Sequence, residues 1–254
     1  MPPIRDQAIV LRTWDYSETS QTASLFTREH GSVRGLAKGS RRDRSSFSGG
    51  LEPLTLGELG ASIKPNSELA TLTDWDLREV FRAARSDLLA HNGAMMIADV
   101  LHHALRPMDP HPGLFDAALA SLRAMDEPVA TPGAVLRFQW ALCRELGFAP
   151  RLELPDALRA TEIVHFSPSQ GAVVASQPPA DAWRVRVETV RLLRNLAEPG
   201  GTQPEARVAS LRAILRASRL LAAYHRHLLE RDLTTLSPYF EQAQRTLTPG
   251  TRGG

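Results

Sequence analysis

Residues 30–51 read HGSVRGLAKGSRRDRSSFSGGL, and this stretch predicts a strand followed by a basic loop. The apolar residues Val33, Leu36 and Ala37 indicate a strand that leaves the core and turns into a mobile loop rich in serine and glycine. Eleven positions hold one acid, Asp43, against five cations, namely Arg34, Lys38, Arg41, Arg42 and Arg44. Glycine lets a backbone approach a ligand closely, and guanidinium groups match phosphate oxygens. We interpret the loop as a contact for a nucleic-acid backbone. The alternative is a solvated loop whose charges serve only solubility.

The composition is that of an ordinary globular protein with an uneven distribution of charge. The chain has 254 residues, of which 43% are hydrophobic and 23% charged, and its formal net charge is +2. Bases outnumber acids in the first fifty residues and again after residue 183, whereas acids outnumber bases over 76–160. Two basic zones around a mildly acidic middle fit a protein with both a polyanion and a protein as partners.

The chain contains no candidate signal peptide or membrane span. Its N-terminus, MPPIRDQ, is not followed by an apolar run, and no stretch approaches the roughly 20 apolar residues that a bilayer requires. The run GAMMIADVL is interrupted by Asp99. We therefore expect a cytoplasmic protein.

The first eighty residues predict a small β-barrel. Five short apolar or alternating runs are separated by turn signals, and they cover residues 8–11, 22–27, 33–37, 51–59 and 69–75. A single sheet of this size would expose its edge strands, and closure into a barrel removes them. We expect a five-stranded barrel over residues 1–80.

The remaining chain predicts helices around a small hairpin. Asp76 and Glu79 resemble a helix N-cap pair, after which apolar residues recur at helical spacing as far as Leu105. Further helices are expected over 115–125, 132–146, 183–196 and 204–231, and the 132–146 helix is apolar on most sides, as a central helix is. Two short runs within 163–174 suggest a hairpin. The expected fold is α+β, with a helical domain over 81–245, a hairpin insertion over 151–182 and a disordered tail over 246–254.

Three aromatic residues near the basic loop are candidates for stacking on nucleic-acid bases. Trp14 and Tyr16 precede the first predicted turn, and Phe47 is isolated in the polar loop. Aromatic side chains bind single strands by stacking, at about 1–3 kcal/mol per base. Alternatively, Trp14 and Tyr16 cover the end of the barrel, and Phe47 anchors the loop to the core.

The last long helix carries a row of arginines at spacings that place them on one face, Arg212, Arg216, Arg219 and Arg226. This row is a candidate for a second DNA surface. It is also a candidate receptor for an acidic peptide tail, with the neighbouring apolar helix surface taking the hydrophobic end of that tail. The remaining alternative is the solvated side of an amphipathic helix.

No catalytic or metal-binding pattern is present in the sequence. The P-loop, the dinucleotide fingerprint, GxSxG and HExxH are all absent. The adjacent pair His102–His103 diverges on a helix, although Asp99 lies close enough in sequence for a histidine–carboxylate contact. Cys143 is the only cysteine, which excludes an intrachain disulfide and a multi-cysteine zinc site.

The sequence resembles the RecO-type family of bacterial DNA repair and recombination mediators. The resemblance is carried by AIVLRTWDYSETSQTASLFTREHGSVRGLAKGSRR at 8–42, LEPLTLGEL at 51–59 and LATLTDWDL at 69–77. Later elements follow in the same order, including LCRELGFAPRLE at 142–153 and YHRHLLERDLTTLSPYF at 224–240. The resemblance extends over most of the chain and is most specific in the first eighty residues.

This resemblance implies an N-terminal OB-type barrel, a helical domain and, in many members, a four-cysteine zinc module. Residues 151–182 occupy the place of that module but contain no cysteine, so we expect a degenerate module without zinc. The implied work is non-enzymatic. Family members bind single- and double-stranded DNA, anneal strands, bind RecR and the C-terminal tail of single-strand-binding protein, and so help load RecA at gaps. That role implies association with the nucleoid.

Two functional hypotheses follow. The first is a DNA-binding, strand-annealing recombination mediator that uses the barrel as its DNA platform. The second is a protein adaptor of the repair machinery for which DNA contact is secondary. A hydrolase is a third hypothesis, and it requires an acid–base cluster assembled by the fold.

Overall fold

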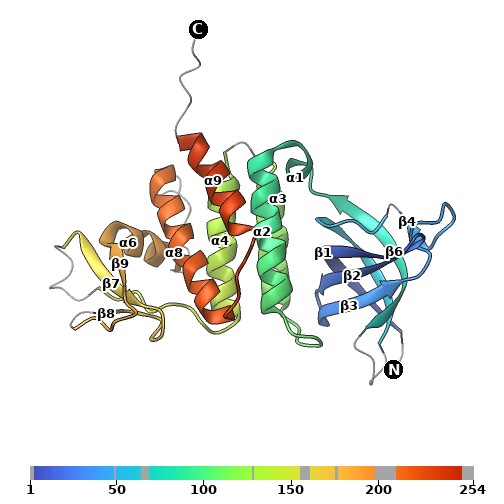
Figure 1. Ribbon diagram of the computed structural model, residues 1–254, viewed down its shortest axis with the longest axis horizontal. Helices are drawn as coiled ribbons and strands as arrows, with labels where there is room; N and C mark the ends of the chain where they lie inside the picture. Colours follow the sequence, from blue (N-terminus) through green and yellow to red (C-terminus); the bar gives the residue numbers. More distant parts are fainter. Residues whose placement is uncertain are drawn as a thin grey trace, which may run out of the picture. The chain divides into compact units, whose positions relative to one another are not determined.

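The computed structural model describes residues 3–48, 50–63, 69–127, 129–154, 161–174, 177–197 and 210–247. The chain separates into two compact units, 1–126 and 127–254. The first unit contains the barrel and three helices, and the second contains a helical bundle with a small sheet (Figure 1). Each unit is described by itself below.

The first unit begins with an OB-type β-barrel. Its strands are β1 (Ile4–Ser17), β2 (Ser20–Thr27), β3 (Gly31–Ala37), β4 (Phe47–Ser48), β5 (Thr55–Ser62) and β6 (Ala70–Val80). They follow the order β3-β2-β1-β5-β6-β4, and β3 also pairs with β6. Five strands therefore form the closed wall, and the two-residue β4 extends it beside β6. The expected five-stranded barrel is confirmed.

Closure of the barrel depends on a short parallel contact between β3 and β6. It consists of three residue pairs, the first being Gly35 with Ala70 and the last Ala37 with Leu72. A Cβ at Gly35 would lie 2.3 Å from Cδ2 of Leu72 and 3.0 Å from the carbonyl oxygen of Ala70, so a side chain there would force Leu72 to shift. The inward-facing side chains of all the strands form one apolar core beneath this contact.

The predicted strands differ from the observed ones mainly in length. The run 51–59 becomes a strand only from Thr55, because Leu54 before it has a φ of +60°. The predicted helix start at Asp76 and Glu79 is wrong. Both residues belong to β6, which continues to Val80 because its last residues pair with the start of β5. The predicted domain boundary at residue 80 coincides with the end of β6 and stays a prediction.

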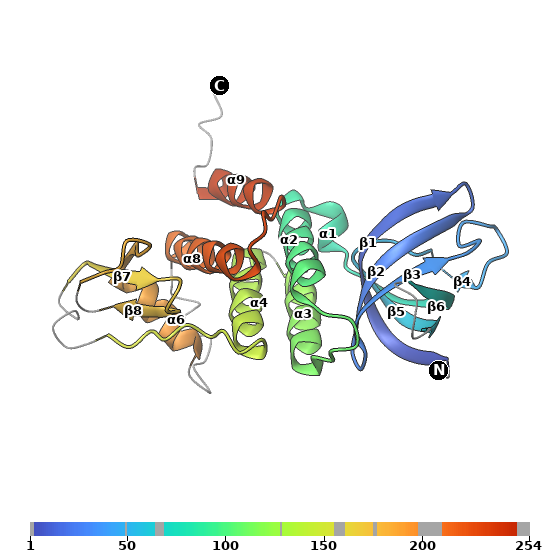
Figure 2. The same ribbon diagram turned by 60° about the horizontal axis from the view of Figure 1, so that its bottom comes forward.

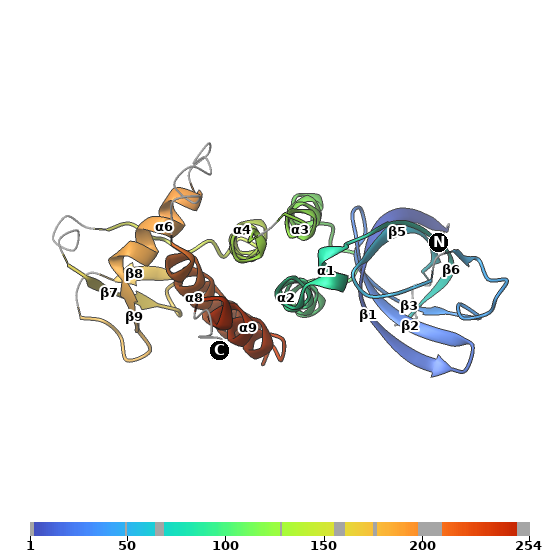
Figure 3. The same cartoon turned by 90° about the horizontal axis from the view of Figure 1, so that it is seen from above.

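Three helices of the first unit follow the barrel, namely α1 (Ala83–Ser86), α2 (Leu88–Ala104) and α3 (Pro112–Ala124). Asp87 caps α2 by accepting a hydrogen bond from the amide of Ala90 at 2.7 Å. Pro112 opens α3, where the missing amide proton costs nothing. In Figure 3 both longer helices are seen end-on beside the barrel wall.

Side chains on β1, on β2 and directly after β2 attach these helices to the barrel. Phe115 of α3 makes an edge-on contact with Phe26 at 5.3 Å between ring centroids, and Arg28 donates two hydrogen bonds to Asp116. On α2, the buried carboxylate of Asp99 lies 2.5 Å from the guanidinium of Arg12. Figure 2 shows α2 and α3 against the long β1–β2 hairpin.

In the residues that the structure describes, the second unit has four helices and a three-stranded sheet. The helices are α4 (Thr131–Glu145), α6 (Val187–Ala197), α8 (Leu211–Leu229) and α9 (Leu236–Leu247), and the strands are β7 (Ile163–Ser167), β8 (Ala172–Val174) and β9 (Trp183–Arg186). The sheet has the order β8-β7-β9. The predicted hairpin is therefore confirmed as β7–β8. The predicted helix start at Trp183 is wrong, because residues 183–186 pair with β7 before the helix begins at Val187.

Helix α4 is central to the second unit, as its apolar pattern predicts. Most of its side chains are buried, and two polar pairs join it to α8. The Ser218 hydroxyl donates to Oε1 of Gln139 at 2.7 Å, and Nε2 of Gln139 donates to the backbone carbonyl of Ser218 at 3.1 Å. One turn later, the Cys143 thiol lies 3.2 Å from Nε2 of His225. All four residues are buried, so these contacts fix the register of α4 against α8.

Burial keeps the Cys143–His225 pair neutral. It raises the pKa of the Cys143 thiol to about 12 and lowers the pKa of the His225 imidazole to about 4. A neutral thiol buried in this way is chemically inert.

The expected disordered tail over 246–254 begins too early. Thr246 and Leu247 are the last residues of α9, and 248–254 lie outside the described residues.

The Arg12–Asp99 pair gives a first testable prediction. Arg12→Met keeps the bulk of the side chain but removes the guanidinium that lies against the buried Asp99 carboxylate. We expect the free energy of unfolding to fall by about 2–3 kcal/mol, below the full value for a buried pair because Arg12 is partly exposed. Urea denaturation measures this change. Arg78→Met, at an exposed ion pair on β6, is the control and should change stability by less than about 0.5 kcal/mol. Equal effects of the two variants would contradict the role given to Asp99.

The buried imidazole of His225 gives a prediction about pH. Its pKa in the folded protein lies near 4, below the ordinary value of about 6.5, so the unfolded chain binds more protons between these values. The pair therefore contributes stability above pH 6.5 that is lost as the pH falls toward 4. From pH 7 to pH 5 we expect a loss of about 1–2 kcal/mol that is missing in His225→Gln. Denaturation of both proteins at the two pH values measures it, and parallel losses would refute it.

Candidate nucleic-acid interface

The basic loop of residues 38–46 is held at several points along its length. The amide of Gly39, where φ is +67°, donates to Oγ of Ser20 at 3.1 Å, and the amide of Arg41 donates to the carbonyl of Thr19 at 3.2 Å. The buried hydroxyl of Ser40 donates to Gln21 at 3.1 Å. The loop thus lies against the β1–β2 turn and is held more firmly than its composition predicts.

The far end of the loop is attached to β6. The Ser46 hydroxyl donates to the carbonyl of Thr73 at 2.7 Å, and the Ser46 carbonyl accepts from the amide of Trp75 at 3.0 Å. Phe47 then pairs with Trp75 and is buried in the barrel core. Phe47 is therefore not available to stack on a base, which corrects that expectation. Its ring anchors the loop, as the alternative interpretation held.

All five predicted cations project from this framework into solvent. Arg34 lies on β3, and Lys38, Arg41, Arg42 and Arg44 lie on the loop. Arg41 forms an exposed ion pair with Asp15 of the β1–β2 hairpin. No ion pair joins Lys38, Arg42 or Arg44 to any residue in the described part of the chain. The charges of Lys38, Arg42 and Arg44 are thus open to a ligand, whereas the guanidinium of Arg41 is already paired with Asp15.

The two other aromatic candidates lie beside these cations. Tyr16 is 64% exposed near the tip of the hairpin, one residue from the Asp15 that pairs with Arg41. Trp14 is 39% exposed, and its ring centroid lies 5.8 Å from that of His102. Both side chains keep an open surface for stacking, and Trp14 also covers part of α2. Their part in binding stays a prediction.

A polar row crosses the outer face of β1, β2 and β3 next to Trp14. The strand register places Arg12 beside Ser24 and Ser24 beside Arg34. Oγ of Ser24 lies 2.9 Å from Nδ1 of His102. Burial, together with the charges of Arg12, His103 and Arg34, lowers the pKa of His102 to about 4, so this imidazole is neutral at pH 7. The cationic character of the row therefore comes from its arginines.

Sequence reasoning missed the residues that connect this face to α2. His103 lies 3.4 Å from Asp99, which confirms the expected histidine–carboxylate contact, but the strong partner of Asp99 is Arg12. The signal was available, because Asp99 is the one charge inside the apolar run GAMMIADVL. A carboxylate in that position needs a cation from another element, and only the fold identifies which one.

The arginine row of α8 is divided among different partners. Arg216 pairs with Glu188 of α6 at 2.7 Å, and Arg226 pairs with Asp232 at 2.6 Å. Arg219 donates to Gln244 of α9 at 3.0 Å and lies over the ring of Phe240. Arg212 is exposed at the start of the helix. The four residues therefore do not form one continuous free surface.

Two members of this row, Arg219 and Arg226, line a pocket between α8 and α9. The pocket has a volume of about 700 Å³, and its apolar wall includes Ala222, Leu236 and Phe240. A third arginine, Arg245, also lines it, together with the acid Glu241. Cations around an apolar wall suit a ligand that combines carboxylates with hydrophobic side chains.

The residues of this chain do not fit a four-thiolate zinc site. The single cysteine is Cys143, and it is buried against His225. Within the ranges that the structure describes, no three histidine, cysteine, aspartate or glutamate residues are grouped as metal ligands. The same residues include no helix that is both long and apolar enough to cross a bilayer.

Comparison with known protein families matches the two parts of the chain to one family. Residues 1–81 match the model described as recombination protein O N terminal, and residues 85–237 match recombination protein O C terminal. Both models together cover the barrel and most of the helical elements.

Individual relatives carry the same description. The chain is 35% identical over 172 residues to DNA repair protein RecO of Rhodopirellula baltica, which covers 66% of this chain and 64% of that protein. It is 32% identical to the Anaeromyxobacter sp. (strain Fw109-5) protein, over 65% of this chain and 66% of that protein. The match therefore spans slightly less than two thirds of these relatives. DNA repair protein RecO of Geobacter sulfurreducens is 31% identical over 79% of this chain and 83% of its own length. With two family models matched in order along it, the chain belongs to the recombination protein O family of DNA repair proteins.

Proposed function

We propose that this protein binds and anneals single strands of DNA on its OB-type barrel and helps load a recombinase at gaps, together with RecR and single-strand-binding protein. The observation that supports this most directly is the basic loop. Lys38, Arg42 and Arg44 are exposed beside the β1–β2 hairpin, without ion pairs to described residues. Unpaired cations next to exposed aromatic rings are the combination by which OB folds bind single strands.

The mechanism follows from the kind of contact that these residues make. Guanidinium and ammonium groups bind phosphate oxygens and carry no sequence information, so the bases of the bound strand stay free to pair. In this mechanism the exposed rings of Tyr16 and Trp14 stack on bases of the bound DNA beside the β1–β2 hairpin. Annealing then needs a second strand to approach this complex, and the cations of the protein offset the repulsion between the two backbones. We expect no zinc in this process.

A specific observation also supports the alternative role as a protein adaptor. The pocket between α8 and α9 combines Arg219, Arg226 and Arg245 with an apolar wall. We propose that it receives the acidic, apolar C-terminal tail of single-strand-binding protein. The two roles are compatible, because the loop and the pocket belong to different units of the chain.

The DNA-binding proposal predicts a salt-dependent affinity that the loop determines. Arg42→Gln/Arg44→Gln should weaken binding of a labelled single strand and reduce the slope of log K against log salt by about 1.4, or about 0.7 for each lost phosphate contact. Fluorescence anisotropy over a salt series measures both quantities. Arg78→Gln/Arg144→Gln, with the same change in charge at exposed sites elsewhere, is the matched control. No binding by the unmodified protein at low salt would end the proposal.

The pocket gives a prediction for the adaptor role. Arg219→Gln/Arg245→Gln should weaken binding of a peptide with the sequence of the partner's C-terminal tail by at least about tenfold, or about 1.4 kcal/mol. Arg212→Gln changes the charge of the same helix outside the pocket and should leave the affinity within about twofold. Calorimetric titration of the peptide into each full-length variant measures the affinities. Equal losses at Arg212 and in the pocket variant would place the peptide elsewhere.

A further inference from the structure

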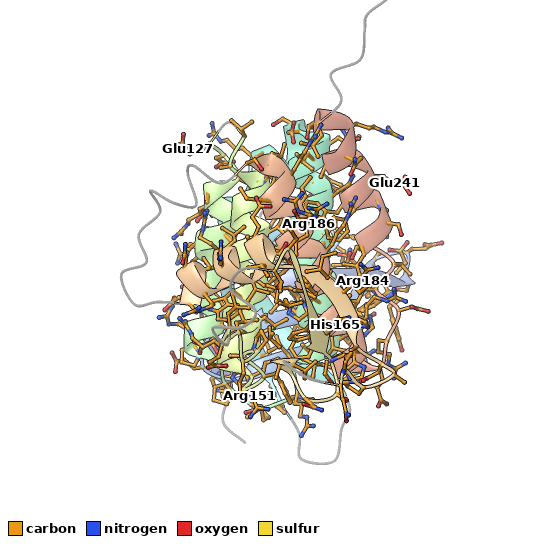
Figure 4. All side chains as sticks on the ribbon, turned by 90° about the vertical axis from the view of Figure 1, so that its left-hand side faces the viewer. Glu127, Arg151, His165, Arg184, Arg186 and Glu241 are labelled. Carbon is orange, nitrogen blue, oxygen red and sulfur yellow. The ribbon has the colours of Figure 1, made fainter. Side chains whose placement is uncertain are left out.

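The outer face of the small sheet in the second unit carries cations that form no ion pair with the described residues. Along β9 the residues Arg184 and Arg186 are exposed, whereas Val185 between them is buried. Both arginines therefore project from the same face of the sheet, about 7 Å apart along the strand. Neither forms an ion pair with any residue in the described ranges. Figure 4 views the protein from the side on which they lie.

The neighbouring strand completes this face. The register of β7 against β9 pairs His165 with Arg184 and Ile163 with Arg186. Directly opposed residues of this kind have Cβ atoms about 4.5–5.5 Å apart, so the four side chains form one compact patch. Ile163 is 39% exposed within it. Arg151 lies beyond the other edge of the sheet, where it pairs with Ala172, and is labelled with the others in Figure 4.

The opposite face of the same sheet is fully used in packing. Val164, Phe166 and Val185 belong to the core of the second unit, and the ring of Phe166 meets that of Tyr224 edge-on at 5.4 Å. The hydrophobic face thus holds the sheet on α8 without any help from the outer face. Substitution of the outer arginines should therefore leave the fold intact.

The charge of the patch indicates an anionic ligand. An exposed edge strand such as β9 is often charged, and charge there also prevents pairing with another chain. Here both charges of the strand are positive. The exposed acids Glu153 and Glu162 lie near Arg151 and Ile163 in the sequence, and within the described residues neither forms an ion pair with Arg184 or Arg186. Guanidinium groups next to an exposed apolar side chain suit a sugar–phosphate backbone, which presents anionic oxygens and apolar sugar edges.

We infer that the outer face of β7 and β9, formed by Ile163, His165, Arg184 and Arg186, is a second binding surface for a DNA strand. The inference rests on the proposed annealing function, to which it adds the place of the incoming strand. The barrel holds one strand through the loop, and this patch binds the phosphates of the complementary strand. The two surfaces lie in different units of the chain and share no residue.

The test separates annealing from single-strand affinity. In the full chain, Arg184→Gln/Arg186→Gln should still bind a first labelled single strand through the barrel loop, which is unchanged, and should lose the binding of a second strand at excess DNA. Its rate of annealing two complementary oligonucleotides should fall about five- to twentyfold at 0.1 M salt, the loss expected for one or two phosphate contacts. Arg144→Gln/Arg231→Gln is the control with the same change in charge, and it should anneal normally. Arg184→Lys/Arg186→Lys keeps the charge and should recover most of the rate.

The outcomes distinguish this inference from the function on which it rests. If the unmodified protein neither binds nor anneals DNA, the proposed function fails first. If it anneals and Arg184→Gln/Arg186→Gln anneals equally well, only the second surface is refuted. An unchanged annealing rate with loss of binding to a purified protein partner would likewise overturn the inference, since the face would then dock a protein. Circular dichroism of each variant shows that the fold is retained.

Discussion

The parallel contact between β3 and β6 is the constraint on which the first unit depends. It spans only three residue pairs, yet it converts a sheet with two open edges into a closed wall. It also determines where the basic loop begins, because the loop leaves β3 directly after Ala37, the last residue of that contact. The absence of a side chain at Gly35 allows the approach, since a Cβ there would overlap Leu72. The contact that closes the barrel therefore also fixes the start of the loop that carries the cations.

The barrel was predictable from sequence because alternation of apolar and polar residues follows directly from a half-buried strand. The end of β6 was not. Asp76 and Glu79 satisfy the local pattern of a helix cap, but β5 offers hydrogen-bond partners to the same residues as far as Val80. Pairing with the preceding strand outweighed the local preference. Trp183 is a similar case. The residues from 183 onward have a helical period, but 183–186 pair with β7 and form a strand instead.

The candidate site divides in a similar way between the predictable and the unpredictable. The loop cations are clear from composition, because so many charges within so few residues cannot be buried together. The fate of the α8 arginines depends on residues that are distant in sequence. Glu188 and Gln244 each take one of them, and no spacing rule within α8 reveals those partners. Phe47 illustrates the limit for a single residue, since a lone aromatic in a polar loop fits a stacking platform and an anchor equally well.

Because the loop is attached at both ends, its conformation is largely set before a ligand binds. Ser20 and Thr19 hold its first residues, and Thr73 and Trp75 hold its last. These nine residues therefore lose most of their backbone conformational entropy when the chain folds. Little further entropy is lost when a ligand binds. A preorganised cationic surface of this kind captures a flexible polymer without first having to find its own shape. The ordering that accompanies capture then falls mainly on the nucleic acid.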